Sequence, residues 1–452
     1  MNILFVRPKP PDETIGLQHV MIVEPLELEI LATLVKENNK VLIVDLILEK
    51  KPFRYFLEQF NPDMVCVTGY ITHTKVMQEI CSSVKKFDST CITVVGGVHV
   101  EQLPETIDHE SIDYRVVRNA TRTFPVLIDY LNKKAYFPAG VLRKGELLVA
   151  ENLPEFDFYV PISDRDLTAK YRERYFYVFH NKVALLKTSF GCPSKCNFCY
   201  CRKITGDHYF ARNLDEVIME LQSIKEKEVY IIDDDFLVSE NRLIAFMDLL
   251  EKFNIRKKYL IYGRADFIVK HTDLLRRFKK LGLRTIIVGF ESFNNEELAS
   301  LNKNTSNKIN EATMNVLNSL EIDCYASIIA MPGWSAEDFN FITRKLISLK
   351  VRFLNIQPLT PLLKTDIDFD DSKLIISRDE FPKWDLAHVV VQPTSMSVKD
   401  FYKNILSMYE SILLRPANIL HHLKYPLIIQ LKLFKGVLKV KKQYRQKLTF
   451  SH

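Results

Sequence analysis

Long apolar runs are missing from this sequence of 452 residues. The first residues, MNILFVRPKP, lack the apolar stretch of about 7–15 residues that a secretory leader needs. No run of about 18 apolar residues offers a membrane span either. We therefore expect a soluble, cytoplasmic protein whose cysteines stay reduced. Apolar residues still make up 47% of the chain, enough for sizeable cores.

Acidic residues are absent after Glu410, and nine Lys and Arg residues follow it. The net charge of the whole chain is only +6, so the excess positive charge is concentrated in the tail and the rest of the chain is not basic. We therefore expect no nucleic-acid partner. A helix is predicted from Pro426, with an apolar stripe of Leu427, Leu431, Phe434 and Leu438 beside a stripe of Lys432, Lys435, Lys439 and Lys442. Such a helix can make a peripheral contact with an anionic membrane. Alternatively, its apolar stripe packs on the protein while the lysines face water.

Residues 1–135 alternate short apolar strands with amphipathic helices. Strands are predicted at 3–6, 41–45, 64–68, 92–95 and 114–117, and helices at 25–37, 53–60, 74–86 and 122–132. Five strands with helices on both faces predict an α/β fold with a doubly wound parallel sheet. Ligands of such sheets bind beyond the carboxyl ends of the strands.

A second alternation of strands and helices occupies residues 181–370. Its six strands are predicted at 183–189, 228–233, 258–263, 284–289, 323–330 and 352–357. Six units are two fewer than a closed eightfold barrel has, so we expect an open partial (β/α)6 barrel with its site at the strand C-termini. Residues 136–180 are interpreted as a connector, and residues 371–452 as a C-terminal helical region that ends in the basic tail.

Three cysteines, Cys192, Cys196 and Cys199, lie within eight residues just after the first of these strands. Iron–sulfur clusters bind thiolates, normally four, so a three-thiol site leaves one iron open for a substrate. Zinc is the alternative, but it needs a fourth ligand such as Cys201 or His208 and usually binds cysteines in two C-x2-C pairs. The remaining cysteines stand singly in apolar segments and are expected to be buried small hydrophobes: Cys66, Cys81, Cys91 and Cys324.

The spacing Cys192-x3-Cys196-x2-Cys199, with Phe198 before the last cysteine, resembles the signature of the radical S-adenosylmethionine superfamily. The resemblance implies a partial barrel and a [4Fe–4S] cluster bound by the three cysteines. The open iron would bind the amino and carboxylate groups of S-adenosylmethionine. One electron from the cluster would then cleave this molecule to methionine and a 5′-deoxyadenosyl radical, which abstracts hydrogen from a substrate. An electron donor such as flavodoxin or ferredoxin is implied as a partner.

Further motifs at successive strand ends resemble a narrower group of this superfamily. Asp233 and Asp234 match an acidic turn beside the methionine moiety, where a carboxylate can pair with the ammonium group. Arg264 lies in an Arg-x-Asp motif, and Glu291 lies in a Gly-x-Glu-Ser motif whose carboxylate can accept hydrogen bonds from the ribose. The resemblance thus implies that S-adenosylmethionine contacts Phe198, Asp233, Asp234, Arg264 and Glu291.

The same group carries an N-terminal cobalamin-binding domain. Residues 1–135 resemble it at the helix start 24–28, at Asp45 and at the turn Gly96-Gly97-Val98-His99, where two glycines let the backbone approach a large flat ligand. The implied cobalamin contacts are Thr68, Gly69, Gly96, Gly97 and His99. Two features depart from the pattern. No Asp-x-His-x-x-Gly motif occurs, so cobalt bound by a histidine is not expected, and the group's glycine-rich turn after the fifth strand is replaced by residues 118–122, which contain no glycine.

Together these motifs resemble the class B-type cobalamin-dependent radical methylases and their anaerobic cyclase and hopanoid-modifying relatives. The expected activity is methylation of an unactivated carbon in a small-molecule or lipid substrate. One S-adenosylmethionine would methylate cobalamin, and a second would supply the radical. The rival expectation is radical cyclisation, ring contraction or another carbon-skeleton change, of a lipid or a tetrapyrrole, without methyl transfer. A metal- or cobalamin-binding accessory protein is the non-enzymatic alternative. No residue pattern assigns a catalytic residue or a substrate.

Overall fold

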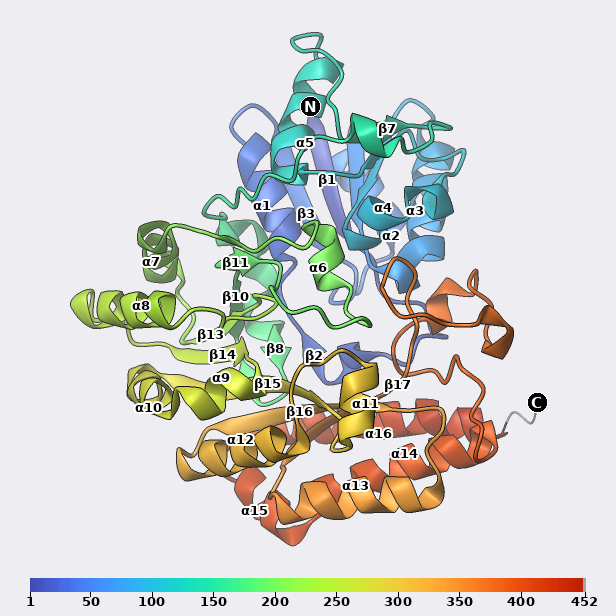
Figure 1. Cartoon of the computed structure of the whole chain (residues 1–452). Helices are drawn as coiled ribbons and strands as arrows, with labels where there is room; N and C mark the ends of the chain where they lie inside the picture. Colours follow the sequence, from blue (N-terminus) through green and yellow to red (C-terminus); the bar gives the residue numbers. More distant parts are fainter. Residues whose placement is uncertain (450–452) are drawn as a thin grey trace. The chain divides into compact units, whose positions relative to one another are not determined.

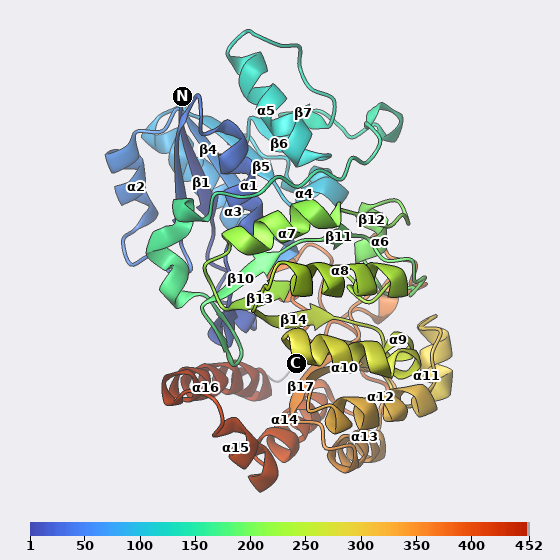
Figure 2. The ribbon, with the colours of Figure 1, turned by 90° about the vertical axis from the view of Figure 1, so that its left-hand side faces the viewer.

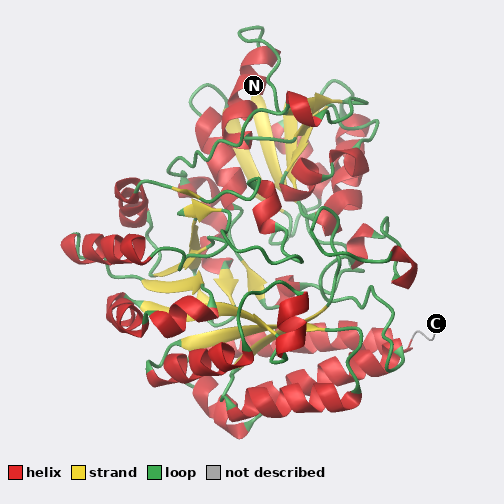
Figure 3. Cartoon of the chain, viewed as in Figure 1, coloured by secondary structure: helices red, strands yellow, loops and turns green. Residues whose placement is uncertain are grey.

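The computed structural model describes residues 1–449, and the chain divides into two compact units. The first unit comprises Met1–Thr14, Glu24–Arg174 and Asp379–Asp385. The second comprises Ile15–Val23, Tyr175–Arg378 and the chain from Leu386 onward. Each unit is built on its own six-stranded sheet, drawn in yellow in Figure 3. Each unit therefore includes at least one short segment that is remote in sequence from its main part.

The sheet of the first unit has the strand order β3-β1-β4-β5-β6-β7. Figure 1 labels β1, β3 and β7 of this sheet. Its strands are β1 (Asn2–Arg7), β3 (Lys40–Asp45), β4 (Met64–Thr68), β5 (Ile92–Gly96), β6 (Tyr114–Val116) and β7 (Val141–Arg143). The first five are parallel, which confirms the doubly wound sheet predicted from the sequence. The sixth strand, β7, pairs antiparallel with β6 and comes from the segment interpreted as a connector. Its three residues are too few to show a hydrophobic period.

Helices cover both faces of this sheet because successive residues of each strand point to opposite sides. The helices are α1 (Leu26–Val35), α2 (Phe53–Phe60), α3 (Thr74–Phe87), α4 (Val98–Gln102) and α5 (Ala120–Leu131). Leu4 and Val6 of β1 pack in one core with α2 and α3. Ile3 and Phe5 pack in a separate core with α1 and α5. The two cores fix the strands in register and bring their carboxyl ends to one edge.

The sheet of the second unit has the order β10-β13-β14-β15-β16-β17, and all neighbouring strands are parallel. The strands are β10 (Val183–Leu186), β13 (Glu228–Ile231), β14 (Lys258–Tyr262), β15 (Leu283–Glu291), β16 (Asp323–Ala330) and β17 (Phe353–Pro358). All six predicted strands are confirmed. Within residues 1–449 the edge strands β10 and β17 do not pair with each other, so the sheet is open as expected.

Helices line the outer side of this second sheet, as Figure 2 shows. They are α7 (Leu214–Ser223), α8 (Glu240–Lys252), α9 (Ala265–Lys270), α10 (Thr272–Leu281), α11 (Asn295–Ser300), α12 (Asn307–Ser319) and α13 (Ala336–Ser348). Alternate strand residues, such as Val229 and Ile231 of β13, pack on the helices in one large core. Short elements complete the unit: β2 (Met21–Ile22), β8 (Phe176–Tyr177), β9 (His180–Asn181), β11 (Ser189–Phe190), α6 (Cys201–Ile204) and β12 (Phe210–Ala211).

The C-terminal region forms three helices, α14 (Val398–Leu413), α15 (Pro416–His422) and α16 (Leu427–Thr449). Asp323, at the start of β16, holds the segment around α15 to the barrel. Its carboxylate accepts hydrogen bonds from His421 Nε2 at 2.9 Å, Lys424 Nζ at 2.8 Å and Tyr425 Oη at 2.7 Å. Although burial raises the pKa of Asp323, these partners lower it well below its usual range. The ionised carboxylate is therefore the form that stabilises this junction.

We predict that Asp323→Asn destabilises the second unit by about 2 kcal/mol near pH 7, because charge-assisted hydrogen bonds to a buried carboxylate are lost. A carboxylate whose pKa is depressed by folding stabilises the protein above its unfolded pKa of about 4 and loses that effect as the pH falls below it. Thermal melting should therefore show a difference between the two proteins above about pH 5 that shrinks below pH 4.

The matched control is Asp248→Asn on α8, where an exposed carboxylate pairs with Arg277 at 2.6 Å. Exposed ion pairs contribute little, so this variant should melt with the unmodified protein. Equal melting of the Asp323→Asn variant would show that the junction does not depend on the carboxylate.

Candidate active site

The loop that carries the three cysteines starts at the carboxyl end of β10 and is anchored to the neighbouring strand end. Asp233, which follows β13, accepts hydrogen bonds from the backbone N–H groups of Thr188 at 2.6 Å and Ser189 at 2.9 Å. Its second oxygen accepts from the hydroxyls of the same two residues. Asp234 accepts from the N–H of Gly191 at 2.8 Å. The two aspartates thus fix the path of the chain into the loop.

Asp233 has a structural role that its motif did not imply. Its side chain is buried, and four donors occupy the acceptor positions of its carboxylate. Asp233 therefore anchors the cysteine loop, and its contact with S-adenosylmethionine stays a prediction. Asp234 is only half-buried and keeps one oxygen 3.6 Å from Lys187 Nζ. It stays a predicted contact of the cosubstrate.

Gly191 opens the loop in a conformation that only glycine adopts readily. Its φ is +84°, and a Cβ there would lie 2.1 Å from the carbonyl oxygen of His208. The far side of the loop is bound to the segment after α11. Asn197 donates to the carbonyl of Ser300 at 2.8 Å, and Asn302 donates to the carbonyl of Lys195 at 2.5 Å. The loop is therefore held on both sides by the neighbouring chain.

The three thiols lie together in this loop, with Cys196 buried and Cys192 and Cys199 half-buried. Within residues 1–449, no three His, Cys, Asp or Glu side chains are already gathered tightly enough to hold a single metal ion. A [4Fe–4S] cluster binds each thiolate through a different iron, so its ligands need not converge on one point. The donor set of three cysteines fits such a cluster, and the ligand assignment stays a prediction.

Cys201 contacts the predicted ligand Cys199. The hydrogen bond between the two thiols lowers the pKa of Cys199 to about 7, and it raises the pKa of Cys201. Burial raises the pKa of Cys192 to about 11. Two of the predicted ligands thus differ in how readily they become thiolates in the cluster-free protein.

Positive charge surrounds Cys196. The Nη1 atom of Arg264 lies 4.0 Å from its sulfur, and Nη2 of the same guanidinium donates to the carbonyl of Lys303 at 3.1 Å. Burial raises the pKa of Cys196, while Lys303 and Arg264 lower it. Lys303 also donates to Glu291 Oε1 at 2.8 Å, and both side chains are nearly buried. Lys303 therefore connects the predicted contacts Arg264 and Glu291, and Arg264 also reaches Cys196 directly.

The sequence did not identify Lys303. It stands alone in the polar stretch Asn302-Lys303-Asn304, which is typical of a solvated turn. Its amine also lies 5.9 Å from the ring of Phe198, another predicted contact. Phe198 itself packs with Leu301, Ile329 and Leu359, which come from elements far apart in the sequence. No local pattern marks such a cluster, because only the fold brings these residues together.

The predicted cobalamin contacts lie together at the carboxyl edge of the first sheet. Thr68 and Gly96 are register partners on β4 and β5. Gly97 has a φ of +108°, and a Cβ there would lie 2.9 Å from both Thr68 Oγ1 and the carbonyl oxygen of Gly69. The turn at Gly97 thus packs so closely on the turn at Thr68 and Gly69 that it has no room for a side chain at position 97. Such an edge fits the approach of a large flat ligand.

His99, the last of these predicted contacts, is buried and neutral, because burial lowers its pKa to about 4. Its Nε2 lies 2.8 Å from Thr106 Oγ1, and its ring packs edge-on against Phe381 at 5.5 Å. Phe381 belongs to the segment Asp379–Asp385, which joins the first unit from far along the chain. His99 is thereby fixed by two neighbours, and Phe381 is a residue of this edge that the sequence did not reveal.

The turn after β6 keeps the shape of a glycine turn without glycine. Asn119 adopts φ +50° and ψ +48°, the left-handed conformation that Asn tolerates better than most residues. Its side chain donates to the carbonyl of Glu155 at 2.6 Å and accepts from the N–H of Asp157 at 2.9 Å. Arg122 stacks on the ring of Tyr159 at 3.8 Å. The segment 155–159 therefore stabilises this turn.

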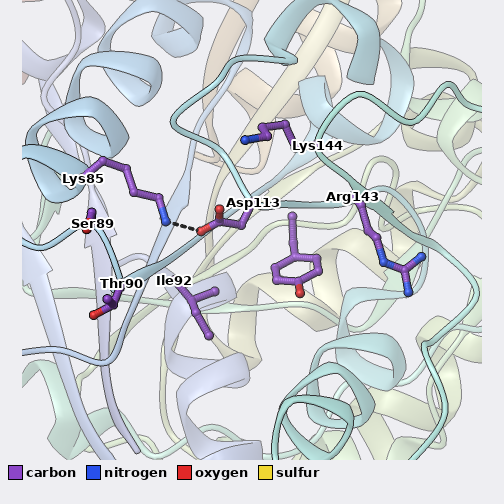
Figure 4. A pocket seen from close by; sticks show the side chains of 8 residues that line it. Lys85, Ser89, Thr90, Ile92, Asp113, Arg143 and Lys144 are labelled. Carbon is purple, nitrogen blue, oxygen red and sulfur yellow. Dashed lines mark hydrogen bonds and ion pairs between the residues drawn. The ribbon is translucent and has the colours of Figure 1, made fainter.

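A polar hollow lies at the opposite edge of the same sheet (Figure 4). Its volume is about 390 Å³, and it is lined by Lys85, Ser89, Thr90, Ile92, Asp113, Tyr114, Arg143 and Lys144. Lys85 Nζ donates to Asp113 at 2.6 Å, so the charges of these two lining residues are already paired with each other. Because it adjoins the amino ends of β5 and β6, it is not part of the predicted cobalamin edge.

Two family models match the chain. The model of the radical SAM superfamily matches residues 186–346, and that of the B12 binding domain matches residues 14–128. The chain belongs to the radical SAM superfamily. It is a radical S-adenosylmethionine enzyme with a B12-binding domain, and its cofactors are a [4Fe–4S] cluster, S-adenosylmethionine and cobalamin.

Curated relatives of this radical SAM enzyme cover most of its length. It is 26% identical to the hopanoid C-3 methylase of Methylococcus capsulatus over 415 residues, which are 90% of this chain and 79% of that protein. It is 22% identical to the anaerobic magnesium-protoporphyrin IX monomethyl ester cyclase of Rubrivivax gelatinosus over 400 residues, which are 84% of this chain and 70% of that protein. The similarity to each relative includes both domains.

Among solved structures, the radical S-adenosylmethionine methyltransferase TsrM from Kitasatospora setae, with cobalamin and a [4Fe–4S] cluster bound, superposes on the chain with a TM-score of 0.70. The match covers 99% of both chains at 15% identity. At this identity the superposition shows that the radical SAM enzyme and TsrM share a fold from end to end.

We predict that Cys196→Ala abolishes cluster loading, because iron loses a thiolate that it needs. Iron and sulfide would be assayed after anaerobic reconstitution, together with the absorbance of the cluster. Cys201→Ala is the matched control, since it removes a neighbouring thiol of the same loop and should load normally. Full loading of the Cys196→Ala protein would contradict the ligand assignment, and failure of Cys201→Ala would add Cys201 to the ligands.

We predict that Glu291→Gln weakens the binding of S-adenosylmethionine roughly 5- to 100-fold while the cluster stays loaded, because a charge-assisted hydrogen bond to the ribose becomes a neutral one. Equilibrium dialysis with the cluster-loaded protein measures the affinity. Glu337→Gln, on the exposed start of α13, is the control and should bind normally. Unchanged affinity of the Glu291→Gln protein would place Glu291 outside the pocket.

Proposed function

We propose that the protein methylates an unactivated carbon of a lipid substrate. One observation supports this proposal most directly: a single chain combines the three-thiol loop of the second unit with the closely packed glycine turns of the first. The similarity to a hopanoid C-3 methylase along 90% of the chain supports the same reaction and favours a substrate of the same lipid class. Methylation requires both cofactors, whereas radical cleavage of S-adenosylmethionine alone requires only the cluster.

When bound, the cluster supplies the electron that cleaves S-adenosylmethionine, and cobalamin carries the methyl group. The chain contributes binding and orientation. Cys192, Cys196 and Cys199 would hold the cluster in the proposed site. Arg264 and Lys303 place two cations beside Cys196, and these offset the negative charge that thiolates bring into a buried loop. Glu291 offers acceptors for the ribose hydroxyls.

A second candidate function is a carbon-skeleton change without methyl transfer. It is favoured by the similarity to an anaerobic magnesium-protoporphyrin IX monomethyl ester cyclase over 84% of the chain. That reaction would use the same cysteine loop and the same contacts with S-adenosylmethionine. The two functions differ in one by-product, because only methyl transfer from S-adenosylmethionine leaves S-adenosylhomocysteine.

We also propose two partners. A flavodoxin or ferredoxin would deliver the electron that each cleavage of S-adenosylmethionine consumes. A membrane would be the place where a cytoplasmic enzyme meets a lipid substrate, and the basic tail after Glu410 supports a peripheral contact of this kind. Both partners follow from the chemistry of the proposed substrate and cofactors.

The test combines the reconstituted enzyme, S-adenosylmethionine, cobalamin, reduced flavodoxin and a hopanoid lipid in detergent under anaerobic conditions. We expect 5′-deoxyadenosine and S-adenosylhomocysteine to accumulate together with a methylated lipid, detected by mass spectrometry. Methyl-deuterated S-adenosylmethionine should transfer its label to the product. Omission of cobalamin should abolish S-adenosylhomocysteine, and the Cys196→Ala protein should make neither by-product.

Other outcomes separate the alternatives. 5′-Deoxyadenosine with a modified lipid but no S-adenosylhomocysteine would replace methylation by the skeleton change. If a fully loaded enzyme forms neither by-product, with a lipid or with a tetrapyrrole, both functions are contradicted and an accessory protein is favoured.

A further inference from the structure

The orientation of α16 on the second unit is fixed by one of its faces. Ile429 and Leu433 pack with Phe176 in a small apolar cluster. Gly436 lies against the chain at His19, where a Cβ would be 1.9 Å from the carbonyl oxygen. Tyr444 meets the rings of Tyr402 and Tyr409 on α14 at 6.0 and 6.5 Å. The contacts run along the helix, so its opposite face points away from the unit.

That opposite face carries the outward stripe, defined as Leu427, Leu431, Phe434 and Leu438. These residues are spaced by four, three and four positions, and therefore form one line along a helix of 3.6 residues per turn. They are between 50% and 69% exposed. The expectation that this stripe packs on the protein is therefore wrong, because a different stripe of the same helix does so.

A row of lysines runs beside the outward stripe. Lys435, Lys439 and Lys442 are exposed and follow the same spacing of four and three. Lys441 is on the other side, where it pairs with Glu410, and the Lys432 amine lies 3.5 Å from the Phe176 ring. No acidic residue occurs in α15 or α16. The outward face of α16 is thus apolar along its centre and positively charged along one side.

The segment before α16 extends this surface in sequence. Leu414, Ile419, Leu420 and Leu423 are all exposed large apolar residues. Figure 2 shows α15 and α16 at one edge of the second unit, joined by a short turn. Ten large apolar side chains are exposed within the 25 residues 414–438. A single exposed leucine is normal on a protein surface, but a concentration of this size indicates an interaction surface. Within residues 1–449 no helix is long and apolar enough to cross a bilayer.

We infer that the outward stripe of α16 enters the surface of an anionic lipid bilayer, with the helix lying in the plane of the membrane. The lysine row would then bind the phosphate and carboxylate groups of the lipid heads. This inference rests on the proposed function, because a lipid substrate gives the enzyme a reason to be there. A second copy of the chain fits less well, since two such faces would bring like charges together without any acidic partner.

The test measures co-sedimentation of the full-length, cluster-loaded protein with vesicles. Vesicles of phosphatidylcholine with phosphatidylglycerol should bind it, and vesicles of phosphatidylcholine alone should bind it at least 10-fold more weakly. Raising the salt from 0.1 M to 1 M should release it, because the screening length falls from about 10 Å to about 3 Å. These results distinguish binding that needs anionic lipid from binding to any apolar surface.

Two variants with matched controls address the residues. Leu431→Gln with Phe434→Gln should weaken vesicle binding roughly 10-fold or more and leave the melting temperature unchanged, because both side chains are exposed and Gln is a good helix former. Tyr136→Gln, which alters a side chain that is 96% exposed in the other unit, should bind normally. Lys435→Gln with Lys439→Gln should weaken binding to anionic vesicles roughly 10-fold, whereas Lys50→Gln with Lys51→Gln should not.

The inference is overturned if the unmodified protein does not bind anionic vesicles, or if the control variants lose binding equally. It is also overturned if the Leu431 and Phe434 variant melts early, or if light scattering shows a dimer that this variant dissociates, since the face would then belong to the core or to a second copy. Formation of 5′-deoxyadenosine from detergent-dissolved substrate is recorded in parallel. Normal vesicle binding without that product would defeat the proposed function and leave the membrane surface standing.

Discussion

Asp233 accepts four hydrogen bonds from Thr188 and Ser189, and the geometry of the cysteine loop depends on them. The ladder between β10 and β13 ends at the pair Leu186 and Ile231. Beyond that pair the chain leaves the six-stranded sheet and pairs only with the two residues of β12, although the loop must present three thiols in a defined arrangement. The buried carboxylate of Asp233 positions the chain here, because it accepts hydrogen bonds from the N–H groups of Thr188 and Ser189, which the six-stranded sheet leaves unpaired.

The same arrangement shows why the sequence motif alone does not determine what Asp233 and Asp234 each do. An acidic turn at a strand end is recognisable from the sequence, but which way each carboxylate faces is decided by the neighbouring strand. Asp233 faces Thr188 and Ser189, whereas Asp234 reaches Gly191 and Lys187. The two adjacent aspartates therefore have different surroundings: Asp233 orders the loop, and Asp234 is the more accessible of the two predicted contacts of S-adenosylmethionine.

Much of the fold could be predicted because buried parallel strands appear as short apolar runs at regular intervals, as at 92–95 and 323–330. The three cysteines were recognisable by spacing alone. Lys303 was not, since its partners Glu291 and Cys196 meet it only in the folded chain. Helix α16 has two apolar stripes, and hydropathy does not tell which is packed. Gly436 was the available signal, because a glycine in mid-helix permits the close approach to His19.

The exchange of short segments between the two units affects how the chain is made. The first unit includes Asp379–Asp385, whose Phe381 packs on His99 and whose Pro382 carbonyl accepts from Thr14 at 2.9 Å. The second unit in turn includes Ile15–Val23. During synthesis from the N-terminus, the first unit therefore cannot be completed until residue 385 of 452 has left the ribosome. The carboxyl edge of the first sheet, the predicted cobalamin edge, is therefore incomplete until the cysteine loop has already been translated. We expect the two units to complete their folding together rather than in succession.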